Sequence, residues 1–218
     1  MCMTDQQNLP TKIPVFPLSN FIFFPKTSVP LNIFEPRYLQ MVNDSIKKDH
    51  FFGMIQPKKI KKDFKQKNIP LYSIGCLGKI KNFSETEDGR IILIINGICR
   101  FKIISEIKTE KMYRIFNVDY SEFNLDLIKK ENPKHKNLEK ILINFKTFLN
   151  KKGYSINWGE IEKQNFGQTI DTLSMISPFT LEEKQTLLET KLIDERIKKL
   201  SKITEIYSKD DFGIKTLQ

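Results

Sequence analysis

The spacing of apolar residues changes near residue 122, and that change constrains the fold of this chain more than any other feature. Short β-prone stretches precede it, whereas apolar residues afterwards recur every three or four positions, as in helices. Strand-type and helix-type segments that are separated along a chain predict an α+β protein. We therefore expect a β-domain at residues 1–122 and a helical subdomain at 123–218, with a polar linker at about 121–135.

The first half predicts a small curled antiparallel sheet or partly open barrel with one inserted helix. Prolines interrupt its early strands, so these should be short, bent or at an edge. The helix should start at Glu35-Pro36, because proline fits the first helical turn. Asp88-Gly89 predicts a hairpin and Asn96-Gly97 a turn or bulge. The β-prone stretches are residues 12–18, 21–24, 28–34, 51–55, 72–83, 90–95, 99–104 and 112–120.

The second half predicts a bundle of short helices. An apolar stripe runs from Leu138 to Leu149, and Gly153 should end that helix. Asn157 should begin a short helix, and Ile170–Ile176 belongs to the next one. Thr180–Glu183 has the sequence of a capping box, in which hydroxyl and carboxylate bind free helix amides reciprocally. The last helix carries Ile193, Ile197, Leu200, Ile203 and Ile206.

Composition and cysteine usage favour a cytoplasmic globular protein. The 218 residues are 39% apolar and 28% charged, which is typical of a folded domain. Three scattered cysteines indicate a reducing compartment and no disulfide framework. The N-terminus has no signal-like pattern, and the longest apolar runs, Phe21–Phe24 and Ile91–Ile95, are far shorter than the roughly 20 residues that span a bilayer. We expect no membrane partner.

A net charge of +10 raises the possibility of nucleic-acid binding. However, only five of the 36 basic residues are arginine, the side chain best suited to phosphate and base edges. The sharpest basic feature is the lysine-rich stretch 58–67, with Phe64 as its single aromatic residue. It could contact RNA or an acidic partner, or it could be a solvated loop between strands.

No motif in the sequence specifies catalysis, a metal or a cofactor. Gly75–Ile80 is too short for a phosphate-binding loop, and no nucleophile elbow or zinc-protease motif is present. His50 and His135 lie in different halves of the chain. Cys76 and Cys99 lie in apolar strands, where cysteine usually acts as a small buried hydrophobe. We expect no catalytic residue, no metal ligand and no cofactor, and therefore no enzyme.

Several segments, taken in order, resemble one family. Ile13–Leu18, Phe24-Pro25 and Pro30–Tyr38 are similar to the signature of the Lon protease N-terminal (substrate-binding) domain. The similarity continues through the helical half, to about residue 207. The further matching segments are Gly53-Met54, Ile74–Cys76, Lys79-Ile80, Asp88–Arg90, Asn96–Phe101, Trp158, Leu173–Phe179 and Glu182–Glu189.

The resemblance implies a PUA-like fold, that is, twisted antiparallel β-sheets forming a pseudo-barrel, followed by a helical bundle. In Lon proteases an ATPase and a protease module follow this region, and the resemblance implies a stand-alone bacterial member without them. It also implies binding of unfolded protein or peptide segments, with a protease or chaperone as a further partner. The alternatives that remain are a PUA-like RNA-binding protein and an uncharacterised hydrolase.

The expected binding residues are five phenylalanines on apolar strands. Phe21–Phe24 is apolar at every position, although successive strand side chains point to opposite faces. Either one face lines a binding groove or both faces are buried in the core. The groove reading assigns binding to Phe21, Phe23, Phe24, Phe51 and Phe52. The residues expected to be structural are Glu35, Arg37, Tyr38, Arg100 and Trp158.

Overall fold

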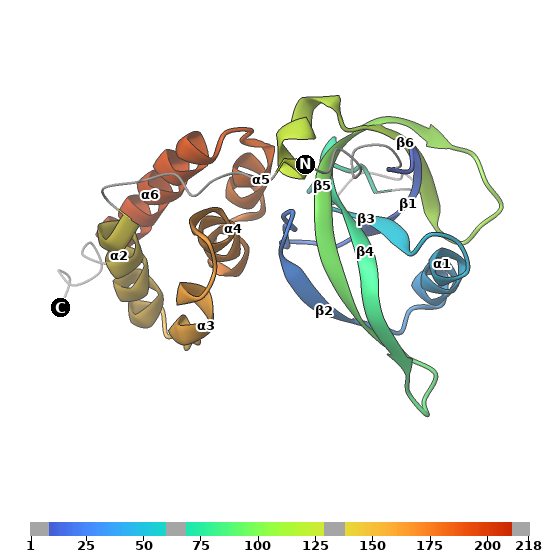
Figure 1. Cartoon of the computed structure of the whole chain (residues 1–218), viewed down its shortest axis with the longest axis horizontal. Helices are drawn as coiled ribbons and strands as arrows, with labels where there is room; N and C mark the ends of the chain where they lie inside the picture. The colour runs from blue at the N-terminus through green and yellow to red at the C-terminus, as the bar shows by residue number, and fades with distance from the viewer. Residues whose placement is uncertain (1–8, 60–68, 129–137, 211–218) are drawn as a thin grey trace, which may run out of the picture. The chain divides into compact units, whose positions relative to one another are not determined.

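Six β-strands form one sheet in the first of two structural units, residues 1–129 (Figure 1). The computed structural model describes residues 9–59, 69–128 and 138–210. The strands are β1 (Lys12–Pro17), β2 (Ser28–Ile33), β3 (Phe51–Ile55), β4 (Ile74–Glu85), β5 (Ile91–Ile107) and β6 (Arg114–Asp119). Their order is β2-β5-β4-β3-β1-β6, and β5 also pairs with β6. That second pairing closes the sheet into the expected pseudo-barrel.

The sheet is mixed, which corrects the expectation of a purely antiparallel one. β1 pairs with β3 in parallel, with Val15 opposite Gly53 and Pro17 opposite Ile55. Parallel neighbours need a long crossover connection, because a tight turn reverses the chain direction. Here β2 and helix α1 (Pro36–Ile46) together provide that crossover.

β5 is a single long strand that contains the feature expected at Asn96-Gly97. Leu77 pairs with Cys99 and Gly78 with Gly97, so that Ile98 has no opposite residue and forms a bulge. The bulge alternative is therefore confirmed at this position, and the turn alternative is wrong. The bend lets the first part of β5 pair with β2 and the last part pair with β6.

Residues 18–27 connect β1 to β2 as an irregular segment, although Phe21–Phe24 was expected to be β-prone. The segment contains two left-handed residues, Asn20 with φ of 56° and Lys26 with φ of 62°. Its backbone bonds to β5, where the Lys26 amide donates to the Gly97 carbonyl at 2.8 Å. The segment thus folds onto the sheet without joining a ladder.

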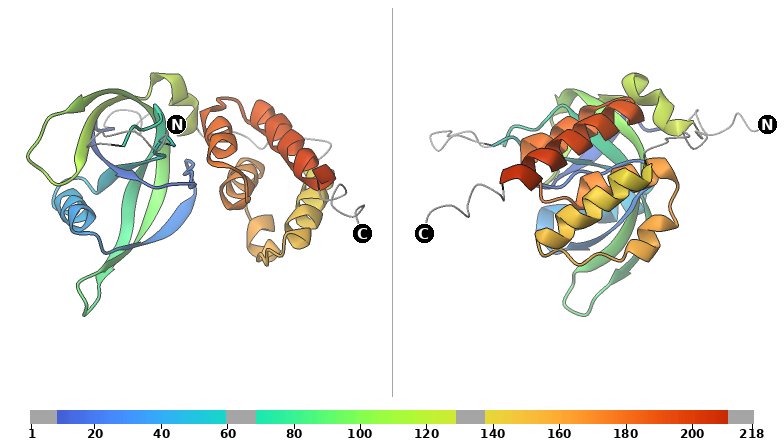
Figure 2. Two further views of the ribbon diagram at one scale, coloured as in Figure 1. Left: turned by 180° about the vertical axis from the view of Figure 1, so that it is seen from behind. Right: turned by 90° about the vertical axis from the view of Figure 1, so that its left-hand side faces the viewer.

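Two apolar layers flank the barrel wall. Inside the barrel, a cluster of buried residues from five strands includes Ile13, Leu77 and Phe101. On the outside, α1 packs against β1 and β3 (Figure 2), and the ring of Tyr38 meets that of Phe16 at 4.5 Å. The helix begins as expected, with Glu35 at the N-cap and Pro36 in the first turn.

The second unit, residues 130–218, contains five α-helices among its described residues. They are α2 (Leu138–Lys151), α3 (Trp158–Glu162), α4 (Phe166–Ile176), α5 (Leu181–Glu189) and α6 (Ile193–Asp210). The capping box at Thr180 and Glu183 is confirmed, and a second one joins Asn165 to Gln168. Together with the β unit, this bundle confirms the α+β class. None of the described helices is long and apolar enough to cross a membrane.

Aromatic rings and one buried ion pair hold the bundle together. The rings of Phe145, Phe148, Phe179 and Tyr207 contact one another at centroid distances of 5.5 to 6.4 Å. α2 and α6 lie side by side (Figure 2). Arg196 of α6 reaches Asp171 of α4 at 2.5 Å and donates to the carbonyl of Thr190 at 2.8 Å. The short 3-10 helix η1 (Ser121–Leu127), which the sequence assigned to the linker, lies with the β unit.

Candidate functional site

An exposed apolar sheet surface in the β unit lies where β4 and β5 run beside β2. We call these three strands, over residues 28–33, 79–85 and 91–96, the arm. Burial alternates along β5: Ile91, Leu93 and Ile95 are buried, whereas Ile92 is 46% exposed and Ile94 37% exposed. Because successive strand side chains point to opposite faces, Ile92 and Ile94 share one face. A run of five apolar residues therefore supplies both a core layer and a surface.

β2 extends this surface. Pro30 lies opposite Ile94 and Asn32 lies opposite Ile92, and both β2 residues are exposed. Directly opposite residues in an antiparallel pair carry their side chains on the same face. We call the surface made by Pro30, Asn32, Ile92 and Ile94 the arm face.

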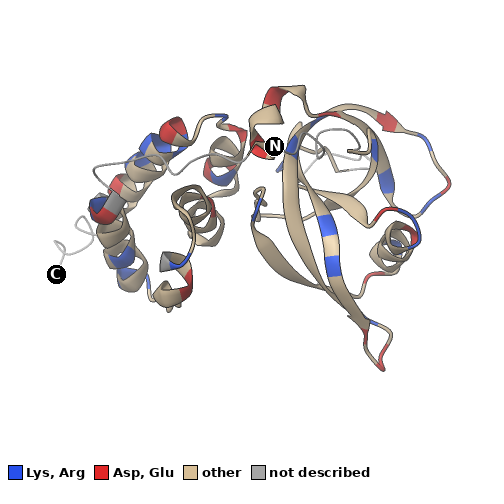
Figure 3. Cartoon of the chain, in the orientation of Figure 1, with Lys and Arg blue, Asp and Glu red and all other residues tan. Residues whose placement is uncertain are grey.

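The arm carries both charges: Lys79 and Lys81 lie on β4, and Glu85 lies at the end of β4, before the acidic hairpin residues Glu87 and Asp88. Lys79 of β4 lies opposite Asn96 of β5, and its ammonium group lies 5.2 Å from the ring centre of Phe51. Figure 3 shows basic bands along β4 and no acidic residue on β2.

The structure divides the five phenylalanines that the sequence proposed as binding residues. Phe23, Phe24 and Phe52 are at most 1% exposed, so the expectation that they face a groove is corrected: they are core. Phe21 and Phe51 are half-buried. Phe23 lies against Gly78 and packs under the sheet, because the segment 18–27 folds across it. The alternative of two buried faces describes this segment.

Sequence reasoning missed Ile92 and Ile94, although their signal was visible. Ile91–Ile95 is one of the two longest apolar runs in the chain. An apolar run in a strand either buries both faces or exposes one of them. The Asp88-Gly89 hairpin directly before it, with Gly89 at φ of 77°, places the run at the start of a projecting strand pair. That position favours exposure of one face.

The cysteines are held in the neutral thiol form. Cys76 and Cys99 are fully buried free cysteines. Burial raises the pKa of Cys99 to about 12 and raises that of Cys76 well above its ordinary value, with the carboxylate of Asp126 adding to both effects. A nucleophilic cysteine needs a lowered pKa and access to solvent, and neither residue has these properties. Among the described residues, no group of three His, Cys, Asp or Glu side chains could hold a metal ion.

The arginines expected to be structural have the expected contacts. Arg100 is 2% exposed and binds both carboxylate oxygens of Asp126, which fixes η1 to β5. Arg37 pairs with Glu35 at 2.8 Å and lies over the ring of Tyr38. Trp158, expected to be in a core or between domains, is only half-buried, and Lys146 lies over its ring at 5.6 Å.

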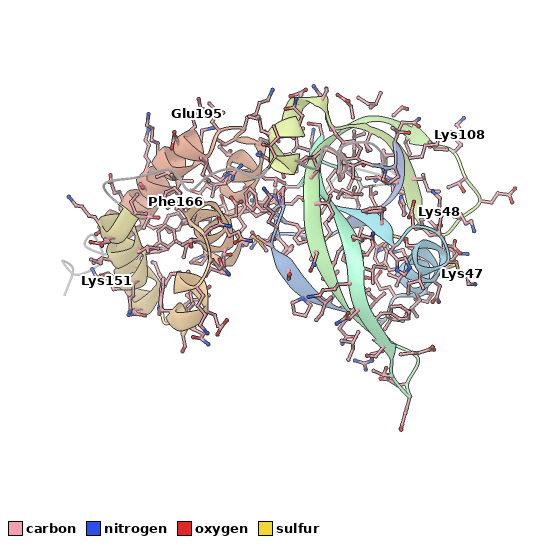
Figure 4. All side chains as sticks on the ribbon, viewed as in Figure 1. Lys47, Lys48, Lys108, Lys151, Phe166 and Glu195 are labelled. Carbon is pink, nitrogen blue, oxygen red and sulfur yellow. The ribbon has the colours of Figure 1, made fainter. Side chains whose placement is uncertain are left out.

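The basic residues of the β unit are spread over its surface. Lys47 and Lys48 project from the end of α1, and Lys108 projects from the loop after β5 (Figure 4). Much of this charge is neutralised locally by Asp or Glu partners, in the pairs Lys48–Asp49, Arg90–Asp88, Lys102–Glu122, Lys111–Asp44 and Arg114–Glu106. Of the lysine-rich stretch 58–67, only Lys58 and Lys59 lie within the described residues, and Lys58 lies over the ring of Tyr72.

The helical unit has a cavity of about 310 Å³ between α2 and α6. Phe145 and Phe148 form its apolar wall, and Lys151, Thr204 and Glu205 are among the polar residues around it. Nothing in its lining converges on a particular ligand chemistry.

Comparison with known proteins agrees with the mixed barrel and bundle just described. Residues 12–205 match the family described as the ATP-dependent protease La (LON) substrate-binding domain. The chain belongs to this family. The sequence resemblance is thereby confirmed over most of the chain, including the helical half.

Relatives place the Lon substrate-binding domain within longer proteins. The chain is 29% identical over 197 residues to a Lon protease of Malacoplasma penetrans, covering 84% of this chain and 24% of that protein. For a Lon protease of Buchnera aphidicola subsp. Schizaphis graminum the identity is 26%, over 93% of this chain and 26% of the relative. The chain thus spans about a quarter of the length of these relatives.

Solved structures of Lon N-terminal domains share the fold. One from Xanthomonas campestris has a TM-score of 0.60 at 20% identity and covers 88% of this chain and 97% of that one. The N-terminal domain of a Mycobacterium avium complex Lon protease has a TM-score of 0.58 at 17% identity, over 89% of this chain and 98% of its own. These likenesses show that the chain has the fold of a Lon N-terminal domain.

Proposed function

We propose that this protein is a non-catalytic module that binds unfolded or hydrophobic polypeptide segments through the arm face, as an accessory to protein quality control. The observation that carries the proposal is the exposure of Ile92 and Ile94 beside each other on a sheet face. Membership in a substrate-binding family supports the same role. The partners that follow are unfolded protein segments, with a protease or chaperone as the recipient of the captured chain.

The chemistry of the arm face suits promiscuous rather than selective capture. Its contacts are two isoleucines, a proline and an asparagine, and these fix few polar groups of a ligand in place. Unfolded chains expose apolar side chains that a folded protein buries, so such a surface distinguishes unfolded from folded proteins. A surface made by only four residues should bind a polypeptide in the micromolar range or more weakly.

The absence of catalysis is part of the proposal. Its support is the state of the two buried thiols, whose raised pKa values keep them protonated at neutral pH. The description of the family as a substrate-binding domain agrees. Binding without turnover is what such a module contributes.

Fluorescence anisotropy tests the proposed function. A labelled, reduced and carboxymethylated model protein is titrated with the full chain. We expect saturable binding in the micromolar range, weakened at least fivefold by the double change Ile92→Asp and Ile94→Asp. Ile104→Asp is the matched control, because Ile104 is 61% exposed on the same strand but outside the arm. Absence of binding at high micromolar concentration, or equal losses in both variants, would contradict the proposal.

RNA binding is the second candidate, favoured by the net charge of +10. It predicts an affinity that falls steeply with salt, because each neutralised phosphate releases counterions. The ion pairs on the described surface of the β unit reduce the charge available for a phosphate track. A labelled single-stranded RNA titrated at several salt concentrations decides the matter, since a flat response would exclude this role.

A further inference from the structure

We infer that the free edge of β2 binds the captured segment as an additional β-strand, with its backbone, while the arm face contacts its side chains. This inference rests on the proposed function and names the class of substrate. It predicts extended segments with apolar side chains at alternate positions, and it excludes helical segments and segments rich in proline.

β2 is an edge strand. It stands at one end of the sheet order, and β5 is the only strand that pairs with it among the described residues. Edge strands present backbone N–H and C=O groups to solvent, which are a template for pairing with another chain. Natural proteins use such edges to bind extended peptides.

The hydrogen-bond pattern shows which backbone groups of β2 point outward. The Gly97 amide donates to the Thr27 carbonyl at 2.9 Å, so Thr27 faces β5. Backbone groups alternate in direction along a strand, so Val29, Leu31 and Ile33 also face β5, whereas Ser28, Pro30 and Asn32 face away. Proline agrees with this assignment, because Pro30 has no N–H to give to β5.

An independent bond across the sheet gives the same alternation. The Ile80 amide donates to the His50 carbonyl at 2.8 Å, away from β5. Ile80 lies opposite Ile95 and Lys79 lies opposite Asn96. Because the Ile80 amide points away from β5, Ile80 and Ile95 do not bond to each other through their backbones. Ile95 must therefore direct its backbone groups to β2, where it lies opposite Val29.

The outward groups of Ser28, Pro30 and Asn32 have no backbone partner within the described part of the chain. The free set comprises the N–H groups of Ser28 and Asn32 and the C=O groups of Ser28, Pro30 and Asn32, that is, two donors and three acceptors. All three residues are exposed. A five-residue extended segment opposite residues 28–32 could form five hydrogen bonds with them.

An extended polypeptide matches this edge in spacing and polarity. Strand residues that share one direction lie about 6.6 Å apart, and the free groups of β2 repeat at that interval. Side chains of the segment opposite Pro30 and Asn32 would lie beside Ile94 and Ile92, on the arm face. Two strands away, on β4, Lys79 lies at the Ser28 end of this edge and Glu85 at its Ile33 end. Pro30 removes one donor, which limits affinity and opposes pairing between two copies of β2.

N-methylation of a bound peptide tests the inference directly. A labelled peptide with alternating valine and threonine is prepared with methyl groups on its odd amides, on its even amides, or on none. We expect one methylated form to lose at least tenfold in affinity and the other to change less than twofold, because only alternate amides face β2. Equal affinities for all three peptides would overturn strand addition while leaving the proposed function intact. Absence of binding by the parent peptide and by the model protein would remove both.

A matched pair of variants locates the strand. Asn32→Pro removes one outward N–H that Asn32→Ala keeps, and both variants lose the same side chain, so the proline variant should bind about tenfold more weakly than the alanine variant. Circular dichroism checks that Asn32→Pro folds; if it does not, protection of the Ser28 and Asn32 amides from hydrogen exchange on adding peptide decides instead. Equal peptide binding by both folded variants would contradict the inference that a peptide binds this edge, and so would the absence of this protection. A dimer that only the proline variant abolishes would show that a second copy of the chain, and not a peptide, occupies the edge.

Discussion

Arg100 of β5 and Asp126 of η1 face each other in a buried two-point ion pair. The Nε–Oδ2 distance is 2.9 Å and the Nη2–Oδ1 distance is 2.8 Å, and the Arg100 amide donates to the same carboxylate at 3.0 Å. The Phe123 ring lies 4.5 Å beneath the guanidinium group. The last segment of the β unit is therefore fixed to the bent part of β5.

Removing the Asp126 carboxylate should destabilise the β unit strongly. Asp126→Ala removes the two-point carboxylate contact of the buried Arg100 guanidinium group, which should lower the free energy of unfolding by about 3 to 5 kcal/mol. Urea denaturation followed by far-UV circular dichroism measures the change. Arg37→Ala is the comparison, because its pair with Glu35 is exposed and should contribute at most about 1 kcal/mol. Similar losses in both variants would contradict this account.

Gly97 should not tolerate a side chain. A Cβ atom there would overlap the Phe24 carbonyl oxygen and lie 2.8 Å from its carbonyl carbon. We expect Gly97→Ala to lower stability by about 1 to 3 kcal/mol, because the segment 18–27 must move off the sheet. Thermal unfolding measures the loss. Gly159→Ala, with its nearest neighbour at 3.4 Å and a helical backbone, should be neutral or slightly stabilising.

The buried thiols should make the protein less stable at high pH. In the unfolded chain a cysteine ionises near pH 9, whereas the folded state keeps Cys99 protonated up to about pH 12. The unfolded state therefore loses protons first, and stability should fall as the pH rises from about 9 towards 12. Urea midpoints at several pH values test this in a Cys2→Ser background. A Cys99→Ala variant should show a weaker dependence on pH.

The same burial should protect Cys76 and Cys99 from alkylation. In a Cys2→Ser background, iodoacetamide at pH 8 should modify neither thiol of the folded protein within an hour, and both in urea. Intact mass spectrometry counts the modified thiols. Rapid labelling of the folded protein would show that one of them is accessible, and this would weaken the proposal that the module is non-catalytic.

Asp44 should contribute to stability at neutral pH and lose that contribution in acid. Hydrogen bonds from Lys111 at 2.9 Å and Tyr113 at 2.8 Å lower the pKa of its carboxyl group. The stabilisation is therefore present above pH 4 and is lost as the pH falls through the lowered pKa. We expect Asp44→Asn to cost about 1 kcal/mol at pH 7 and less at pH 2. Urea titrations at the two pH values check the difference.

Local sequence determined the organisation of this protein. The helix start at Pro36, the hairpin at Gly89, the bulge at Gly97 and the capping box at Thr180 depend on residues a few positions apart. Backbone conformation and capping are decided at that range, so sequence alone predicted them, except that it left a turn or a bulge open at Asn96-Gly97. The α+β class followed from the order of strand-type and helix-type segments, and the family from the resemblance of segments such as Pro30–Tyr38 to a known signature.

Tertiary structure decided which apolar residues form the surface. The sequence favoured Phe21–Phe24 as a binding surface, but Ile91–Ile95 is equally apolar at every position, so the apolar pattern alone does not show which run is exposed. The choice depends on contacts between distant segments: residues 18–27 fold across β5 at Gly97, which buries Phe23 and Phe24. Burial is a property of the assembled sheet, because only the partner that covers a strand face determines whether that face meets water.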